Sequence, residues 1–421
     1  MFVEHYPTLQ GGIYSPASNS APNLKSAPRE IGVSGEQDHG GVGSMTATSI
    51  ALRCAETVSL ILDSIEISDL IEQIEFLRWT GRPGYSTRTL MGIALAKSLY
   101  AIPTWTRTLA LVKDHAGLRA AIGCVNDRDV PSIDAVYRFT KKLSLYEGQR
   151  QACIDSVLNA LGSKNPHMGE NIAIDGSSIP AYANGQRFKS KGGRERKPEE
   201  YSDPDASWGH RSAISTQKGG RFYGYKLHMA VDAATDLPLA WTVETAKDSE
   251  AKFALSLLEE VRERGFSVHT AAMDKGYDSG AIYEGCEEHD VRPIIPLRET
   301  AGVKKGDHNP PRCKHGVWQF AGADYKRGAS KWRCPTGQCS PASVWKKADR
   351  LFPLVPRYTK RWKKLYCGRA SVEREFGRLK NEWGLTPLRV RRIERVKLHA
   401  DLTILTKLCY ELAKTRNSRI L

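Results

Sequence analysis

The stretch Gly224-Tyr-Lys-Leu-His-Met-Ala-Val-Asp232 alternates in polarity from residue to residue, which predicts a β-strand. A turn follows at Ala233-Ala-Thr-Asp236, and Leu237-Pro-Leu-Ala-Trp-Thr-Val-Glu244 then predicts a returning strand. Upstream, Asn171-Ile-Ala-Ile-Asp175 is a short run rich in β-forming residues. We therefore expect three antiparallel strands in this part of the chain.

The residues that follow alternate between helical and strand patterns. Ser249 to Arg264 and Ser279 to His289 predict helices, whereas Ser267 to Met273 and Val291 to Pro296 predict strands. Three strands, a helix, a strand, a helix and a strand make a mixed α/β sheet in the order of ribonuclease-H-like folds.

The N-terminal part of the chain reads differently. Residues 1–44 are rich in Ser, Gly and Pro without apolar periodicity, which predicts a disordered tail, and Met45 is an alternative start. Residues 45–165 predict an all-helical domain that suits DNA docking, although helical packing alone also explains the pattern. In it, one acidic amphipathic helix is expected around Ile61 to Leu77, and Ser86 or Thr87 is expected to cap the next helix.

Charge is concentrated near the C-terminus. The chain of 421 residues carries a formal net charge of +15, and residues 357–397 hold 14 Lys and Arg against 4 Asp and Glu. This concentration favours a nucleic-acid partner over a merely soluble surface. No run of 18 apolar residues and no secretion signal is recognised, so a cytoplasmic location without a membrane partner is the expectation. Nine scattered cysteines do not suggest a disulfide framework.

Two aspartates stand out by context. Asp175 is expected to end the first strand before Gly176-Ser-Ser, and Asp274 to end the fourth strand before Lys-Gly-Tyr277. Carboxylates at strand ends are exposed at the edge of a sheet, where ligands gather.

The third informative stretch is Tyr366-Cys-Gly-Arg-Ala-Ser-Val-Glu-Arg-Glu-Phe-Gly-Arg-Leu-Lys380. On one continuous helix, Tyr366, Arg369, Glu373 and Lys380 share a stripe. This pattern is also compatible with a surface helix that carries ordinary ion pairs. Glu375 is a rival to Glu373, but two residues turn a helix by about 200°, so only one of them can face the aspartates.

Asp175, Asp274 and Glu373, together with the pattern Tyr-x2-Arg-x3-Glu-x6-Lys, resemble bacterial insertion-sequence DDE transposases. The resemblance covers residues 80 to 415 and implies a ribonuclease-H-like catalytic domain over residues 166–415, with an insertion at 300–350. It implies that these three carboxylates are catalytic and hold two Mg²⁺ or Mn²⁺ ions. It also implies a homodimer acting on double-stranded DNA, both the terminal inverted repeats of the element and the target.

The residue chemistry agrees with that implication. Phosphodiester cleavage needs an acidified water and a stabilised leaving oxygen, and oxygen-only ligands select Mg²⁺ or Mn²⁺ over zinc. Arg369 and Lys380 are expected to bind DNA phosphates, and Tyr366 to contact a phosphate or stack. His228, in a predicted strand, is not expected to be catalytic.

A second metal site is conceivable in the insertion, which is expected to be irregular. Cys313, His315, Cys334 and Cys339 make a Cys3His set for structural zinc, although neither pair has the common spacing and the four residues need share no ligand.

Three functions stay open at this point. The leading one is an active transposase that cleaves insertion-sequence ends and transfers the strand into target DNA. The others are a ribonuclease-H-like endonuclease without strand transfer and a catalytically silent DNA-binding protein derived from a transposase. The intact set of three carboxylates argues against the silent protein.

Overall fold

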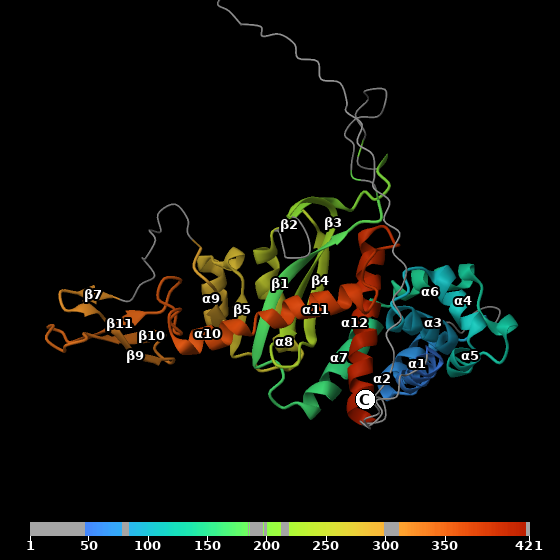
Figure 1. The fold of residues 1–421 in the computed structure, drawn as a ribbon, viewed down its shortest axis with the longest axis horizontal. Coiled ribbons are helices and arrows are strands. Elements are labelled where there is room, and N and C mark those ends of the chain that lie inside the picture. The colour runs from blue at the N-terminus through green and yellow to red at the C-terminus, as the bar shows by residue number, and fades with distance from the viewer. Residues whose placement is uncertain are drawn as a thin grey trace, which may run out of the picture. The chain divides into compact units, whose positions relative to one another are not determined.

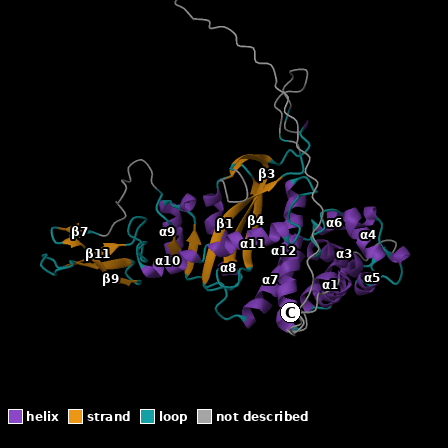
Figure 2. Ribbon diagram, viewed as in Figure 1, coloured by secondary structure: helices purple, strands orange, loops and turns teal. Residues whose placement is uncertain are grey.

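The computed structural model describes residues 47–77, 84–183, 185, 197, 200–211, 219–298 and 311–417. The predicted tail at 1–44, most of a charged stretch between Arg187 and Gly219 and the first part of the predicted insertion lie outside the described residues. The described chain is a mixed α/β structure in which helices surround a central sheet (Figure 2).

Among the described residues, seven α-helices precede the sheet: α1 (Ala47–Leu62), α2 (Ile65–Phe76), α3 (Thr87–Leu99), α4 (Trp105–Asp114), α5 (Ala116–Ala121), α6 (Ile133–Leu143) and α7 (Glu147–Lys164). Several begin at the hydroxyl residue that the sequence offers. Ser86 caps α3 as expected by accepting a hydrogen bond from the Thr89 N–H, and Ser132 caps α6 in the same way.

The single acidic helix expected from Ile61 to Leu77 is wrong, because the chain turns at Asp63 and Ser64 between α1 and α2. The Ser64 hydroxyl donates to the carbonyl oxygen of Ile61 at 2.8 Å and satisfies an acceptor at the end of α1. Short polar side chains can end a helix in this way by bonding to its backbone. The spacing of apolar residues does not reveal such an end.

The central sheet has the strand order β4–β3–β1–β5–β6, and β2 (Ser207–Arg211) also pairs with β3. Its strands are β1 (Asn171–Pro180), β3 (Gly220–Asp232), β4 (Pro238–Thr245), β5 (Thr270–Met273) and β6 (Arg292–Ile294). β1, β3 and β4 are antiparallel as predicted, whereas β5 and β6 run parallel to β1. Helices α8 (Ala254–Glu263) and α9 (Gly280–Glu288) make the two crossovers.

Asp175 does not end a strand, because β1 continues for five more residues and pairs with β3 as far as Pro180. The Gly-Ser-Ser sequence reads as a turn by local propensity, but cross-strand pairing overrides it. On the other edge of β1, the pairing with β5 stops at Ile174, so Asp175 lies where the parallel part of the sheet ends.

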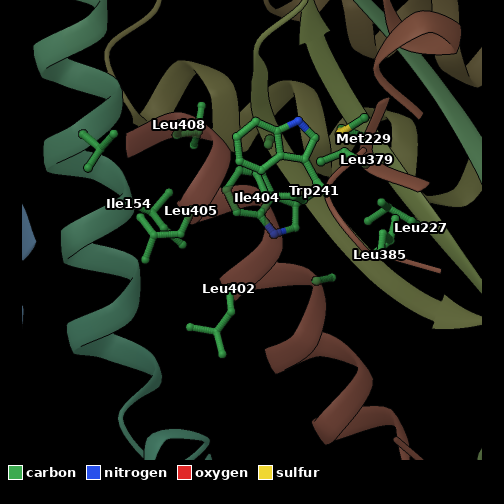
Figure 3. Close-up of a cluster of buried hydrophobic side chains, with 14 of the residues drawn as sticks. Ile154, Leu227, Met229, Trp241, Leu379, Leu385, Leu402, Ile404, Leu405 and Leu408 are labelled. Carbon is green, nitrogen blue, oxygen red and sulfur yellow. The ribbon is translucent and has the colours of Figure 1, made fainter. Parts of the chain in front are cut away.

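Three C-terminal helices complete the core: α10 (Lys360–Cys367), α11 (Ala370–Asn381) and α12 (Ile393–Arg416). α11 crosses the sheet in contact with β1 and β3, and α12 contacts β4 as well as α1, α3 and α7 (Figure 1). Figure 3 shows Leu402, Ile404 and Leu405 of α12 packed with Trp241 of β4 and Ile154 of α7. The helical segment and the sheet thus share one hydrophobic core.

The predicted insertion is not irregular in its described part. It contains a two-stranded hairpin, β7 (Arg312–Cys313) with β8 (Gly316–Val317), and a three-stranded sheet of β9 (Gln319–Asp324), β10 (Ala329–Arg333) and β11 (Ser343–Lys347). Strands this short, rich in Gly and Lys, leave almost no alternating pattern to recognise.

Candidate active site

Asp175 and Asp274 are neighbours because of strand register. Ile174 of β1 and Met273 of β5 are partners in the parallel ladder, so the residue after each occupies the next pair of positions. Adjacent strands lie about 4.8 Å apart, and side chains at paired positions point to the same face. The two carboxylates therefore lie side by side at the edge where β5 ends.

The surroundings of Asp175 make its negative charge costly. Its side chain is only 16% exposed. Burial raises the pKa of the Asp175 carboxyl to about 7, and nearby Asp274 and Glu250 add to the rise. The Gly176 N–H, which donates to Oδ1 at 2.8 Å, and the Arg369 guanidinium oppose it. A buried carboxylate with this balance is a place where additional positive charge is stabilising.

Arg369 joins Asp175 to Glu373. Its Nη1 lies 2.9 Å from Asp175 Oδ2, and its Nη2 donates to Glu373 Oε1. Glu373 lies in the first turn of α11, and its side chain is 55% exposed. One guanidinium therefore brings the strand carboxylate and the helix carboxylate together.

The continuous helix expected from Tyr366 to Lys380 is wrong. α10 ends at Cys367 and α11 begins at Ala370. At the junction, the N–H groups of Gly368, Arg369 and Ser371 each bond to the carbonyl three residues earlier. A helical wheel assumes 3.6 residues in every turn. Because this turn is tighter, the wheel does not give the correct direction of the Tyr366 side chain relative to α11.

Glu375, the rival carboxylate, faces away from the aspartates. It is fully buried and forms an ion pair with Lys407 of α12, 2.5 Å from Oε2 to Nζ. Burial raises the pKa of the Glu375 carboxyl to about 7. Glu375 thus belongs to the packing between α11 and α12, and Glu373 is the helix carboxylate that shares Arg369 with Asp175.

Lys380 and Tyr366 both contact other residues of the protein. Lys380 Nζ donates to Ser177 Oγ at 2.7 Å and to the Ser178 carbonyl at 2.8 Å, which fastens α11 to β1. Burial lowers the pKa of the Lys380 ammonium to about 8. Tyr366 stacks on Trp362, with ring centroids 4.8 Å apart and an angle of 13° between the planes.

Sequence reasoning missed a polar group behind Asp175. Glu250, just after β4, pairs with Lys226 Nζ at 2.9 Å. A Cβ on Gly176 would lie 2.9 Å from Glu250 Cγ and 3.0 Å from His228 Nδ1, so glycine is required for this close approach. No sequence signal separates Glu250 from other acidic residues at helix starts.

His228 is fully buried beside Phe253, with ring centroids 4.6 Å apart. Neither ring nitrogen has a hydrogen-bond partner among the described residues, and burial lowers the pKa of the imidazole to about 4. The neutral ring packs against the glycine beside Asp175. The structure thus places His228 as a packed residue of β3.

The insertion gathers three of the four residues expected to bind zinc. The sulfur atoms of Cys313, Cys334 and Cys339 all lie within 4.8 Å of one another. His315 is not in this group, although its Nε2 is buried and has no hydrogen-bond partner in the described structure.

Fold and site define a class: an α/β protein with a carboxylate cluster at the edge of a mixed sheet, crossed by a basic helix. A family model described as a transposase DDE domain matches residues 166–409, more than half of the chain. The chain belongs to this DDE transposase family.

No curated protein matches the chain. Among solved structures, it is similar to a chain of the cryo-EM structure of a piggyBac transposase synaptic complex with hairpin DNA. The identity is 12%, the TM-score is 0.38, and the match covers 86% of this chain and 75% of that chain.

Proposed function

We propose that this protein is an active DNA transposase that cleaves the ends of an insertion sequence and transfers the strand into target DNA. One observation carries the proposal: Asp175 and Asp274 lie on adjacent strands, and Arg369 joins Asp175 to Glu373, all within the family-matched segment. The strand order, with three antiparallel strands and two parallel strands connected through helices, supports a ribonuclease-H-like core over residues 166–415.

The donor set fits divalent metal ions. Asp175, Asp274 and Glu373 offer only carboxylate oxygens, which suit Mg²⁺ or Mn²⁺. Asp175 is largely buried, and among the described residues Arg369 is its one ion-pair partner, so an added positive charge would stabilise its carboxylate. When bound there, two such ions supply an acidified water and stabilise the charge on the leaving oxygen.

The protein's own groups position the DNA. Arg369, if it exchanges a carboxylate for a phosphate, presents two parallel donors at the edge of the carboxylate cluster. Lys380 holds α11 against β1 and thereby sets where Glu373 stands relative to Asp175. Tyr366 offers a stacking or phosphate contact beside Trp362.

The basic segment at 357–397 divides between internal pairs and exposed cations. Arg374 and Arg378 pair with Asp236, and Arg357 donates to the Ile295 carbonyl. The other group consists of exposed cationic side chains that can bind a polyanionic partner: Lys360, Arg361, Lys363, Lys364, Arg389, Arg391, Arg392 and Arg395. Their distribution supports double-stranded DNA, both terminal repeats and target, as the partner.

Three further parts of the proposal extend beyond the site. The helical segment at 45–165 is proposed to dock DNA, and two copies of the chain to hold paired ends. The proposed location is the bacterial cytoplasm. Among the described residues, no helix is long and apolar enough to cross a membrane.

The test separates cutting from binding. The variants Asp175→Asn, Asp274→Asn and Glu373→Gln keep side-chain size but remove a charge. Mg²⁺-dependent nicking of labelled DNA that carries the element's own ends should be lost in all three. Binding in a gel shift at fixed salt should survive, because it rests on the exposed cations.

Glu382→Gln is the matched control, since Glu382 is exposed at the end of the same helix. Normal nicking by all three carboxylate variants would overturn the mechanism. A strand-transfer assay with pre-cut ends distinguishes the transposase from an endonuclease that only cleaves.

A further inference from the structure

We infer that the insertion contains a structural zinc site formed by Cys313, Cys334 and Cys339, with His315 as the fourth ligand. This inference is independent of the proposed cleavage chemistry, which uses carboxylates elsewhere in the chain.

The sulfur geometry matches a tetrahedral ion. At a Zn–S distance of about 2.3 Å, two ligands of one tetrahedral ion are about 3.8 Å apart. The Cys313 and Cys334 sulfur atoms are 3.8 Å apart, and all three sulfurs lie within 4.8 Å of one another. A disulfide needs about 2.05 Å and uses two thiols, so it leaves one of the three without a role.

The three thiols come from separate parts of the insertion. Cys313 ends β7, Cys334 directly follows β10, and Cys339 lies in the connection to β11. Convergence of residues from a hairpin and from a sheet requires the whole insertion to fold around them. An ion at this point would fasten the β7–β8 hairpin to the β9–β11 sheet.

The surroundings of His315 give a second observation in favour of zinc, independent of the sulfur geometry. It lies in the turn of the β7–β8 hairpin, two residues after Cys313, and its Nε2 is buried without a hydrogen-bond partner among the described residues. A buried imidazole nitrogen without a partner is costly, and metal ligation removes that cost. A side-chain rotation toward the thiols would complete a Cys3His set.

The described part of the insertion has only a small apolar core. The apolar cluster there contains three buried residues, Trp318, Trp332 and Cys334, with a few partly buried neighbours around them. Small units with so little apolar burial are commonly stabilised by a metal, whose binding free energy becomes folding free energy.

The experiment uses the full-length protein, purified under reducing conditions without chelators. Elemental analysis should find about one zinc per chain, as expected for a closed site with four ligands. Cys313→Ser and Cys334→Ser should lose it, whereas Cys367→Ser should retain it, because Cys367 is an exposed thiol outside the cluster. His315→Ala should weaken zinc retention against a chelator by at least the roughly 10-fold to 100-fold that loss of an outer-shell partner costs.

A second readout keeps the inference testable if a cysteine variant misfolds. Co²⁺ exchanged into the wild-type protein should give the thiolate charge-transfer absorption of a tetrahedral site. Absence of zinc together with freely titratable thiols would overturn the inference. A disulfide among the three cysteines in freshly reduced protein, seen as a mass lower by two hydrogens, would overturn it as well.

Discussion

Asp175→Asn should stabilise the metal-free protein while it abolishes cleavage. In the folded state, burial raises the pKa of the Asp175 carboxyl from its usual 3.8 to about 7. At roughly 1.4 kcal/mol for each pKa unit, ionised Asp175 lowers the free energy of unfolding by up to about 4 kcal/mol. Asparagine keeps the shape and carries no charge, so it removes this cost.

The sign of the effect depends on pH. Because the folded-state pKa is the higher one, the protonated form favours folding: no cost exists below pH 3.8, and the cost is complete once the pH exceeds about 7. The advantage of Asp175→Asn should therefore be greatest at pH 8 and should shrink steadily toward pH 4. The Arg369 ion pair does not change this sign, because the raised pKa of Asp175 is already net of the lowering that Arg369 causes.

The assay is urea denaturation in the presence of EDTA at pH 8, 6 and 4.5, with the free energy of unfolding compared at each pH. Asp290→Asn is the control, because that side chain is 87% exposed and should show no such trend. A variant less stable than wild type at pH 8, or a gain that does not change with pH, would refute the reasoning.

Two more predictions concern α11. Lys407→Met should lower the free energy of unfolding at pH 8 by roughly 3–5 kcal/mol, because it leaves the buried Glu375 carboxylate of α11 without its cation, and urea denaturation measures this; a loss under about 1 kcal/mol would contradict the buried pair. Lys380→Met keeps the apolar stem but loses both bonds to β1, so cleavage should fall at saturating DNA, where weaker binding is compensated. If saturating DNA restores the wild-type rate, Lys380 acts on binding alone.

Much of the sheet could be predicted from the sequence, because its strands are long or strongly alternating. β3 and β4 were expected within a few residues of their observed bounds, as were the crossover helices α8 and α9. The errors arose where long-range pairing decides local structure: β1 extends through Gly-Ser-Ser because β3 lies beside it. The short strands of the insertion carry too few residues to show a period.

The candidate site likewise has a part that local sequence patterns predict and a part that depends on long-range contacts. Asp175 and Asp274 could be chosen from the sequence because each follows an apolar strand run, and parallel register then places them together. A wheel argument separates Glu373 from Glu375, since opposite sides of one helix meet different neighbours. Glu250 could not be found, because its approach to Asp175 and its ion pair with Lys226 depend on how the chain continues after β4.

Arg369 is expected to compete with a divalent cation for the carboxylates of the site, and this competition has a measurable consequence. Its guanidinium contacts Asp175 and Glu373, two of the three proposed ligands, and its side chain is 20% exposed. A metal ion and Arg369 therefore compete for the same carboxylates. Arg369→Ala should bind Mn²⁺ in the absence of DNA more tightly, by a few-fold to about tenfold, because roughly 1 kcal/mol of ion pairing no longer opposes it.

The same Arg369→Ala variant should cleave end DNA more slowly, since it lacks the proposed phosphate contact. Calorimetric titration with Mn²⁺ measures the first effect, and nicking at saturating Mn²⁺ measures the second. Asp175→Asn is the comparison that should lose Mn²⁺ affinity. Weaker Mn²⁺ binding by Arg369→Ala would mean that Arg369 organises the carboxylates for the ion instead of competing with it.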